Sequence, residues 1–113
     1  MLFRSDYGDG GKIEADLEKA NIIVNRQLIP GDIKAKRHYM HPGGIRLGTS
    51  EVTRLGMKES EMGQIASLIK NVIVDNEDRK DIAKKIAEFR KNYQKTQYCF
   101  DNKLGAYEYV KLR

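Results

Sequence analysis

The stretch of sequence that decides the fold runs from Gly43 to Met57 and reads GGIRLGTSEVTRLGM. Ile45 and Leu47 alternate with small or polar residues, and a period of two predicts a strand with one buried face. Arg46 belongs to the opposite face, among glycines that leave room for a small anion. Its planar guanidinium can hold a carboxylate through two parallel hydrogen bonds, whereas a structural arginine would bind backbone carbonyl groups instead. From the residues alone, both roles remain open.

A tight turn and a short helix are predicted directly after this strand. Thr49 and Ser50 have hydroxyl groups that can accept hydrogen bonds from free N–H groups at a helix start. Gly56 stands where a helix commonly ends in the left-handed conformation.

Periodicity predicts further helices and strands on either side. Apolar residues at helical spacing predict helices over 11–21, 58–75 and 79–93, whereas β-branched or apolar runs predict short strands over 2–5, 22–24 and 96–100. Asp75 to Asp78 offers caps for the last helix, and Asp81 and Lys85 are spaced to form an ion pair on it. The predicted core positions of the last two helices are Met62, Ile65, Ala66, Ile69, Val72, Ile73, Ile82, Ala83, Ile86, Ala87, Phe89 and Tyr93.

Length and composition are typical of one globular domain. The chain has 113 residues, of which 40% are hydrophobic and 33% are charged. It contains no apolar run long enough for a membrane span and no apolar signal region near Met1. Cys99 is the only cysteine, so no internal disulfide can form, which fits a reducing cytoplasm. We therefore expect a cytoplasmic protein without membrane partners.

The net charge of +5 is concentrated in residues 79–95, which contain seven basic and two acidic side chains. Such a run could attract nucleic acid or an acidic partner. A solvated helix face is the more common explanation, and we favour it. His38 and His41 lie in a polar connection over 33–42, but two histidines without a third nearby ligand make a poor metal site. We expect no metal there.

Two motifs in the chain resemble serine hydroxymethyltransferase, a pyridoxal-phosphate enzyme of fold type I. The first is Gly43 to Met57 followed by KESEM, and the second is LEKANIIVN at 17–25 followed by LIPGD at 28–32. They occur in the family order and are similar to the small, C-terminal domain of archaeal members. The resemblance covers residues 1–101. Residues 102–113 match nothing in the family and form a tail of unknown role.

The resemblance implies an α+β fold, with a small, mainly antiparallel sheet of about three strands and helices packed on one face. It implies one-carbon transfer between serine and a reduced pterin, with pyridoxal 5'-phosphate bound by a large domain that this chain lacks. The aldimine lysine and the other cofactor-binding residues belong to that domain, so we expect the isolated chain to be inactive and free of cofactor. Arg46 matches the arginine that binds the substrate carboxylate, with Gly44, Gly48 and Thr49 shaping its turn. The loop over 33–42 is either a cosubstrate contact or a solvated connector.

Two alternatives to a detached enzyme domain remain. The chain could be an autonomous module that binds a small carboxylate or an acidic partner, or it could be one half of a split enzyme. A domain built to pack on a missing partner would leave apolar surface uncovered, which would favour aggregation or a homodimer.

Overall fold

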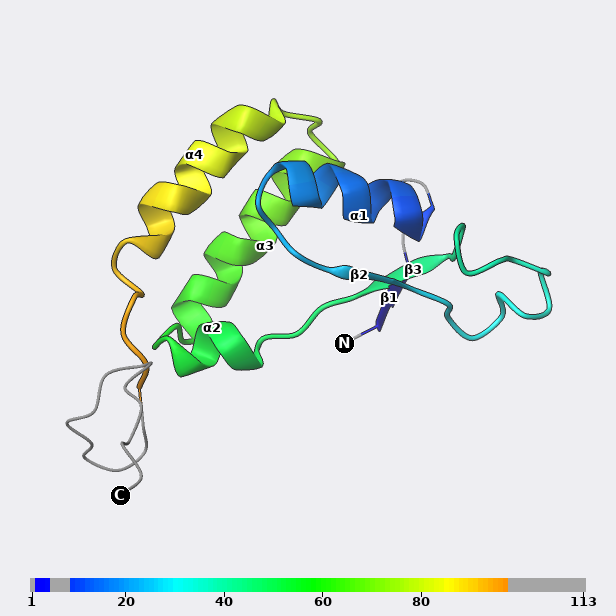
Figure 1. Ribbon diagram of the computed structural model, residues 1–113, viewed down its shortest axis with the longest axis horizontal. Coiled ribbons are helices and arrows are strands. Elements are labelled where there is room, and N and C mark those ends of the chain that lie inside the picture. The colour runs from blue at the N-terminus through cyan, green and yellow to red at the C-terminus, as the bar shows by residue number, and fades with distance from the viewer. Residues whose placement is uncertain (1, 5–8, 98–113) are drawn as a thin grey trace, which may run out of the picture.

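The computed structural model describes residues 2–4 and 9–97 (Figure 1). The predicted tail over 102–113 and residues 98–100 of the predicted last strand lie outside this part, and Thr96 and Gln97 are not in a strand. The described elements, in chain order, are β1 (Leu2–Arg4), α1 (Gly10–Lys19), β2 (Asn25–Gln27), β3 (Gly44–Arg46), α2 (Ser50–Arg54), α3 (Glu59–Ile73) and α4 (Arg79–Arg90).

The three strands form one antiparallel sheet in the order β1-β3-β2. Ile45 lies opposite Phe3 on one side and Arg26 on the other, so the last strand in sequence occupies the centre of the sheet. The predicted α+β class with a small antiparallel sheet is confirmed. The strand order depends on pairing between distant segments, and the sequence patterns could not predict it.

The predicted strand over 22–24 is wrong in position, because pairing begins only at Asn25. Asn21, two residues after the end of α1, is in the left-handed conformation with φ 62°, and the next three residues carry the chain from the helix to the sheet. Within them Val24 is buried, whereas Ile23 is 78% exposed. The β-branched run therefore supplies a core contact, and the register of β2 on β3 places the ladder farther along the chain.

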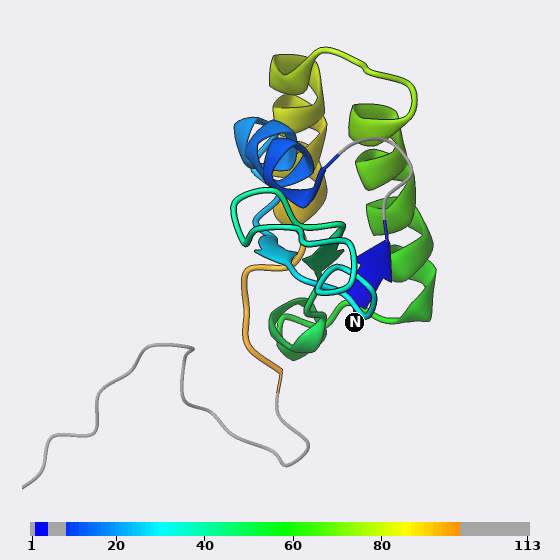
Figure 2. The ribbon, with the colours of Figure 1, turned by 90° about the vertical axis from the view of Figure 1, so that its right-hand side faces the viewer.

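One hydrophobic core joins the helices to the sheet. Helix α1 contacts β2, β3, α3 and α4, and α3 packs against α4 (Figures 1 and 2). Leu17 and Ile45 are fully buried where α1 covers the sheet. The buried members of this core are Ile13, Leu17, Ala20, Val24, Ile45, Val72, Ile82 and Ile86. The central position of α1 explains why its apolar face is the most completely covered.

The apolar stripe predicted for α3 is buried only in part. Val72 is buried, and Ile69 and Ile73 pack partly buried against the core, but Ala66 is exposed. At 1.5 Å per residue, the 15 residues of α3 are longer than the ten of α1 on which they pack. The first turns of α3 therefore extend beyond the core. Ala87 of α4, also predicted to be buried, is exposed as well.

The ends of α4 agree only partly with the sequence prediction. The side chain of Asp78 caps the helix by accepting from the backbone N–H groups of Lys80 and Asp81, as expected from its position. The expected pair between Asp81 and Lys85 is wrong, since Asp81 lies 3.4 Å from Lys84 and Lys85 binds Glu77 instead. In the described residues, no helix is both long and apolar enough to cross a bilayer.

Candidate functional site

Arg46 is the last residue of the central strand. Its neighbour Ile45 is fully buried under α1, so the alternation of the strand directs Arg46 to the other face of the sheet. Its side chain is exposed there and forms no hydrogen bond or ion pair within the described part of the chain, whereas its backbone belongs to the sheet ladder. A guanidinium so placed can donate hydrogen bonds to a ligand carboxylate without first breaking a contact with the described residues.

Asn25 is the nearest neighbour of Arg46 on the adjacent strand. The two residues are directly paired in the register of β2 on β3, so their side chains leave the sheet on the same face. Both are exposed. Local sequence patterns do not indicate a role for Asn25, because its pairing with Arg46 joins distant segments of the chain.

The chain immediately before Arg46 packs closely on the first turn of α1. Gly10 donates its backbone N–H to the carbonyl oxygen of Pro42 at 2.8 Å. A Cβ atom at Gly10 would lie 2.1 Å from the carbonyl oxygen of Gly44. Gly44, one of the predicted supporting residues, thus lies where β3 and α1 approach each other.

The other predicted supporting residues, Gly48 and Thr49, follow Arg46 in the chain. Gly48 is exposed, and a Cβ atom there would meet no atom within 4 Å. Thr49 occupies the position before α2, but its side chain makes no capping hydrogen bond, so the predicted hydroxyl cap is wrong. The α2 backbone is already turned into the helical region at Thr49, with φ −109° and ψ −3°, which is not the extended geometry of a side-chain cap. The left-handed glycine at the other end is confirmed, with φ 95° at Gly56.

A buried carboxylate contacts the residue that precedes β3, and no local sequence pattern indicates this contact. Asp32 is 5% exposed, and its Oδ2 accepts hydrogen bonds from the backbone N–H groups of Ile29 and Gly43, at 3.0 and 2.7 Å. The same carboxylate lies 3.8 Å from Nε of Arg37. Asp32 follows Pro30-Gly31, where an aspartate is typical of turns, so its sequence position hid this longer-range role.

A second charged contact joins α1 to the sheet. Glu14 accepts hydrogen bonds from Nε and the backbone N–H of Arg26, at 2.6 and 2.9 Å. The side-chain hydrogen bond from Arg26 lowers the pKa of Glu14, and the pKa of Arg26 is raised in turn by the same bond. Because Arg26 pairs with Ile45 in the register, this ion pair lies on the face covered by α1.

The loop over 33–42 is exposed from Ile33 to His41, whereas Pro42 at its end is buried. Ile33 is 83% exposed, and Tyr39 and Met40 are also exposed. Nδ1 of His41 lies 3.6 Å from Oδ2 of Asp9. The pKa of Asp9 is lowered mainly by the hydrogen bond that its carboxylate accepts from the backbone N–H of Lys12, and to a smaller extent by His41. The described residues contain no cluster of three or more His, Cys, Asp or Glu side chains suited to a metal.

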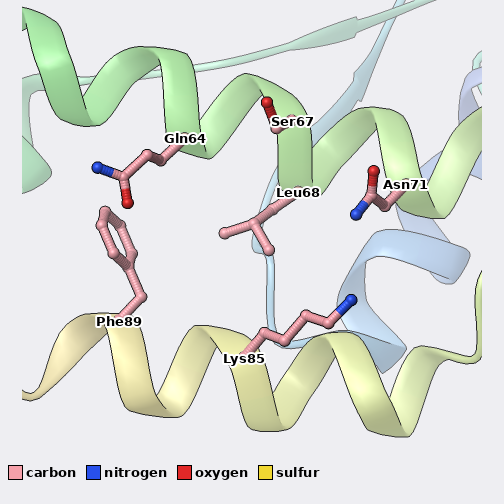
Figure 3. Close-up of a pocket in the computed structure, with 6 residues that line it drawn as sticks. All are labelled: Gln64, Ser67, Leu68, Asn71, Lys85 and Phe89. Carbon is pink, nitrogen blue, oxygen red and sulfur yellow. The ribbon is translucent and has the colours of Figure 1, made fainter.

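A groove of about 300 Å³ lies between α3 and α4, on helices that carry none of the predicted site residues (Figure 3). Leu68 and Phe89 point into it, and the side chain of Lys85 extends along it toward Asn71. Lys85 is also bound to Glu77 at 3.0 Å. The other residues that line the groove are Gln64, Ser67 and Asn71.

The described residues do not fit a pyridoxal-phosphate site. Every lysine among them is exposed, including Lys85 at the groove. A lysine that holds such a cofactor needs a sheltered pocket with phosphate ligands and an acid for the pyridine nitrogen.

Comparison with known proteins identifies the family of the chain. A sequence profile described as serine hydroxymethyltransferase matches residues 1–69, more than half of the chain. A serine hydroxymethyltransferase from Nitrosopumilus maritimus is 73% identical over 108 residues, which are 96% of this chain and 24% of that protein. Those from Cenarchaeum symbiosum and Korarchaeum cryptofilum are 70% identical over 108 residues and 51% identical over 102 residues, covering 96% and 90% of this chain and 24% and 23% of the relatives.

The chain thus spans about a quarter of the length of the relatives it matches. The expected resemblance to archaeal members of the family is confirmed. The profile match includes both sequence motifs and the whole three-stranded sheet. This chain belongs to the serine hydroxymethyltransferase family.

Proposed function

We propose that this chain is the C-terminal part of a glycine/serine hydroxymethyltransferase, in which Arg46 binds the α-carboxylate of the amino-acid substrate. The complete enzyme transfers a one-carbon unit between serine and a reduced pterin and uses pyridoxal 5'-phosphate as its cofactor. The cofactor is bound by a large domain that corresponds to the remaining three quarters of the relatives. That domain is then the main partner of this chain.

One observation carries the role of Arg46. The residue lies on the central strand with its side chain facing away from α1, and this side chain is exposed and has no hydrogen-bond or ion-pair partner among the described residues. An arginine with a purely structural role would instead donate hydrogen bonds to nearby backbone carbonyl groups. In the proposed role, Arg46 orients the substrate through two charge-assisted hydrogen bonds and leaves the bond chemistry to groups of the large domain.

The experiment that tests this role uses a complete enzyme. We would build a chimera in which this chain replaces the matching quarter of the Nitrosopumilus maritimus relative, to which it is 73% identical. Arg46→Ala should lower kcat/KM for serine by about a hundredfold or more, since two hydrogen bonds to a charged group are lost. Arg46→Lys keeps the positive charge but loses the planar guanidinium that forms two parallel hydrogen bonds, so its kcat/KM should lie between those of the parent enzyme and Arg46→Ala.

The matched control is Arg90→Ala, which removes another exposed arginine at the end of α4. It should leave kcat/KM unchanged. Calorimetric binding of glycine gives a readout separate from turnover, and Arg46→Ala should weaken that binding by a similar factor. Unchanged glycine affinity in Arg46→Ala would reject the carboxylate role while leaving the family assignment intact.

The mass of the native polypeptide separates the detached domain from the alternatives. A species several times larger than 13.0 kDa, recognised by an antibody to residues 43–57, would support a segment of a complete enzyme. A species of 13.0 kDa would support a split enzyme or a free binding module. The basic run on α4 gives little support to a module for acidic partners, because Lys84, Lys85 and Lys91 each pair with a nearby acid.

A further inference from the structure

The buried Asp32 is the charged group that the proposed function leaves unexplained. Its Oδ2 accepts from the N–H of Ile29, which precedes the loop over 33–42, and from that of Gly43, which directly follows it, so a single oxygen atom links the two segments that flank the loop. Within the loop, the backbone N–H of Arg37 donates to the carbonyl oxygen of Asp32 at 2.9 Å. A buried carboxylate needs such partners, and each bond it accepts restricts the chain that donates it.

Gly43 connects this carboxylate to the candidate site, because it directly precedes β3 and lies three residues before Arg46. A Cβ atom at Gly43 would lie 2.6 Å from Oδ1 of Asp32. On the other side, Gly10 of α1 binds Pro42 and packs on Gly44. The strand entry is therefore held between a carboxylate and the first turn of a helix.

We propose that Asp32 is a positioning residue for Arg46. By fixing the N–H of Gly43, it sets the start of β3 and with it the place from which the guanidinium reaches a substrate carboxylate. The inference rests on the carboxylate role proposed for Arg46. Asp32 itself is buried and does not touch the substrate, so its effect on catalysis passes through the arginine.

A double-mutant cycle on the chimera tests this inference. With Arg46 present, Asp32→Ala should raise KM for serine by about tenfold, because a misplaced fork loses part of its two hydrogen bonds. With Arg46→Ala already in place, the same change should alter KM by less than about twofold. A residue that acts only on folding would have equal effects in both backgrounds, since independent changes add.

Two further variants protect the test against a folding defect. Asp32→Asn keeps the size of the side chain and one oxygen that can accept from Gly43, so it should raise KM by only about threefold. The matched control is Asp78, another carboxylate that accepts from two backbone N–H groups, but at the start of α4. Asp78→Ala should leave KM for serine within twofold of the parent in either background.

The outcomes separate this inference from the proposed function. If Arg46→Ala has no effect on KM, the carboxylate role fails and the inference fails with it. If Arg46→Ala raises KM but Asp32→Ala and Asp32→Asn act equally in both backgrounds, only the positioning role is overturned. Loss of the Asp32 effect in the Arg46→Ala background supports it.

Discussion

Gly10 and Gly44 are in backbone contact, with the first residue of α1 lying against the carbonyl group of the first residue of β3. The close approach requires that Gly10 lack a side chain. It also places a helix start directly behind the strand that carries Arg46. The contact joins the segment at 10–19 to the family motif at 43–57.

Gly10→Ala should destabilise the chain, because its Cβ atom would lie 2.1 Å from a backbone oxygen. Separating α1 from β3 to admit a methyl group should cost about 1–3 kcal/mol, the usual range for overpacking. Urea unfolding of the 113-residue chain gives this value. Gly63→Ala is the control: it is exposed in α3, with no atom within 4 Å of the added methyl group. That change should stabilise the chain by about 0.5–1 kcal/mol.

The ion pair between Glu14 and Arg26 should make stability depend on acid pH. Arg26 lowers the pKa of Glu14 below its ordinary value of 4.5. The contribution of this carboxylate is therefore complete above about pH 4.5 and is lost as the pH falls through the lowered pKa. Glu14→Gln should lower the urea midpoint at pH 7 and have much less effect at pH 2.5. Glu88→Gln, which removes an exposed pair with Lys91, is the control and should have little effect at either pH. An equal loss at both pH values in Glu14→Gln would contradict the prediction.

Leu17→Ala should be among the most damaging core substitutions. Leu17 is fully buried in α1, between the sheet and the outer helices. Truncating such a residue removes buried apolar area and leaves a cavity, so the expected loss is about 2–5 kcal/mol of unfolding free energy. Ile23→Ala removes a side chain that is 78% exposed and should cost less than about 0.5 kcal/mol. Similar losses for the two variants would show that the core is not centred on α1.

Gly56→Ala should cost about 1–2 kcal/mol, because residue 56 has φ 95° and an L-residue is strained there. The added Cβ atom would also lie 3.0 Å from the side chain of Gln97. Gly48→Ala is the comparison, since it meets no neighbouring atom within 4 Å and has no positive φ. Thermal unfolding should show a lower Tm for Gly56→Ala and an equal or slightly higher Tm for Gly48→Ala. A Tm unchanged by Gly56→Ala would mean that the turn after α2 adopts another geometry.

Much of the fold could be predicted from the sequence because its signals are local. The apolar spacing of α1, α3 and α4, the glycine at position 56 and the alternation around Ile45 each depend on a few neighbouring residues. The motif at 43–57 also led to the family. The predicted burial of Ala66 was wrong because of helix length. The apolar stripe of α3 continues beyond the part of the core that α1 can cover, so Ala66 is exposed.

The parts that could not be predicted depend on distant pairing. Ile22 to Val24 has strong β propensity, but the ladder forms at Asn25–Gln27 because that segment lies opposite β3. The same pairing brings Asn25 beside Arg46. Asp32 lies in a typical turn sequence, and only the folded chain shows that its carboxylate reaches the residue before β3.

The central position of β3 has a consequence for how this segment can change in evolution. Gly44, Ile45 and Arg46 are bound on both edges, by β1 and by β2. Because a strand reverses its faces at every residue, losing or gaining one residue here would turn the arginine into the core and the isoleucine out to solvent. Lengthening the exposed loop over 33–42 would carry no such inversion. In this segment the number of residues is constrained as well as their identity, and changes in length should be confined to the loop.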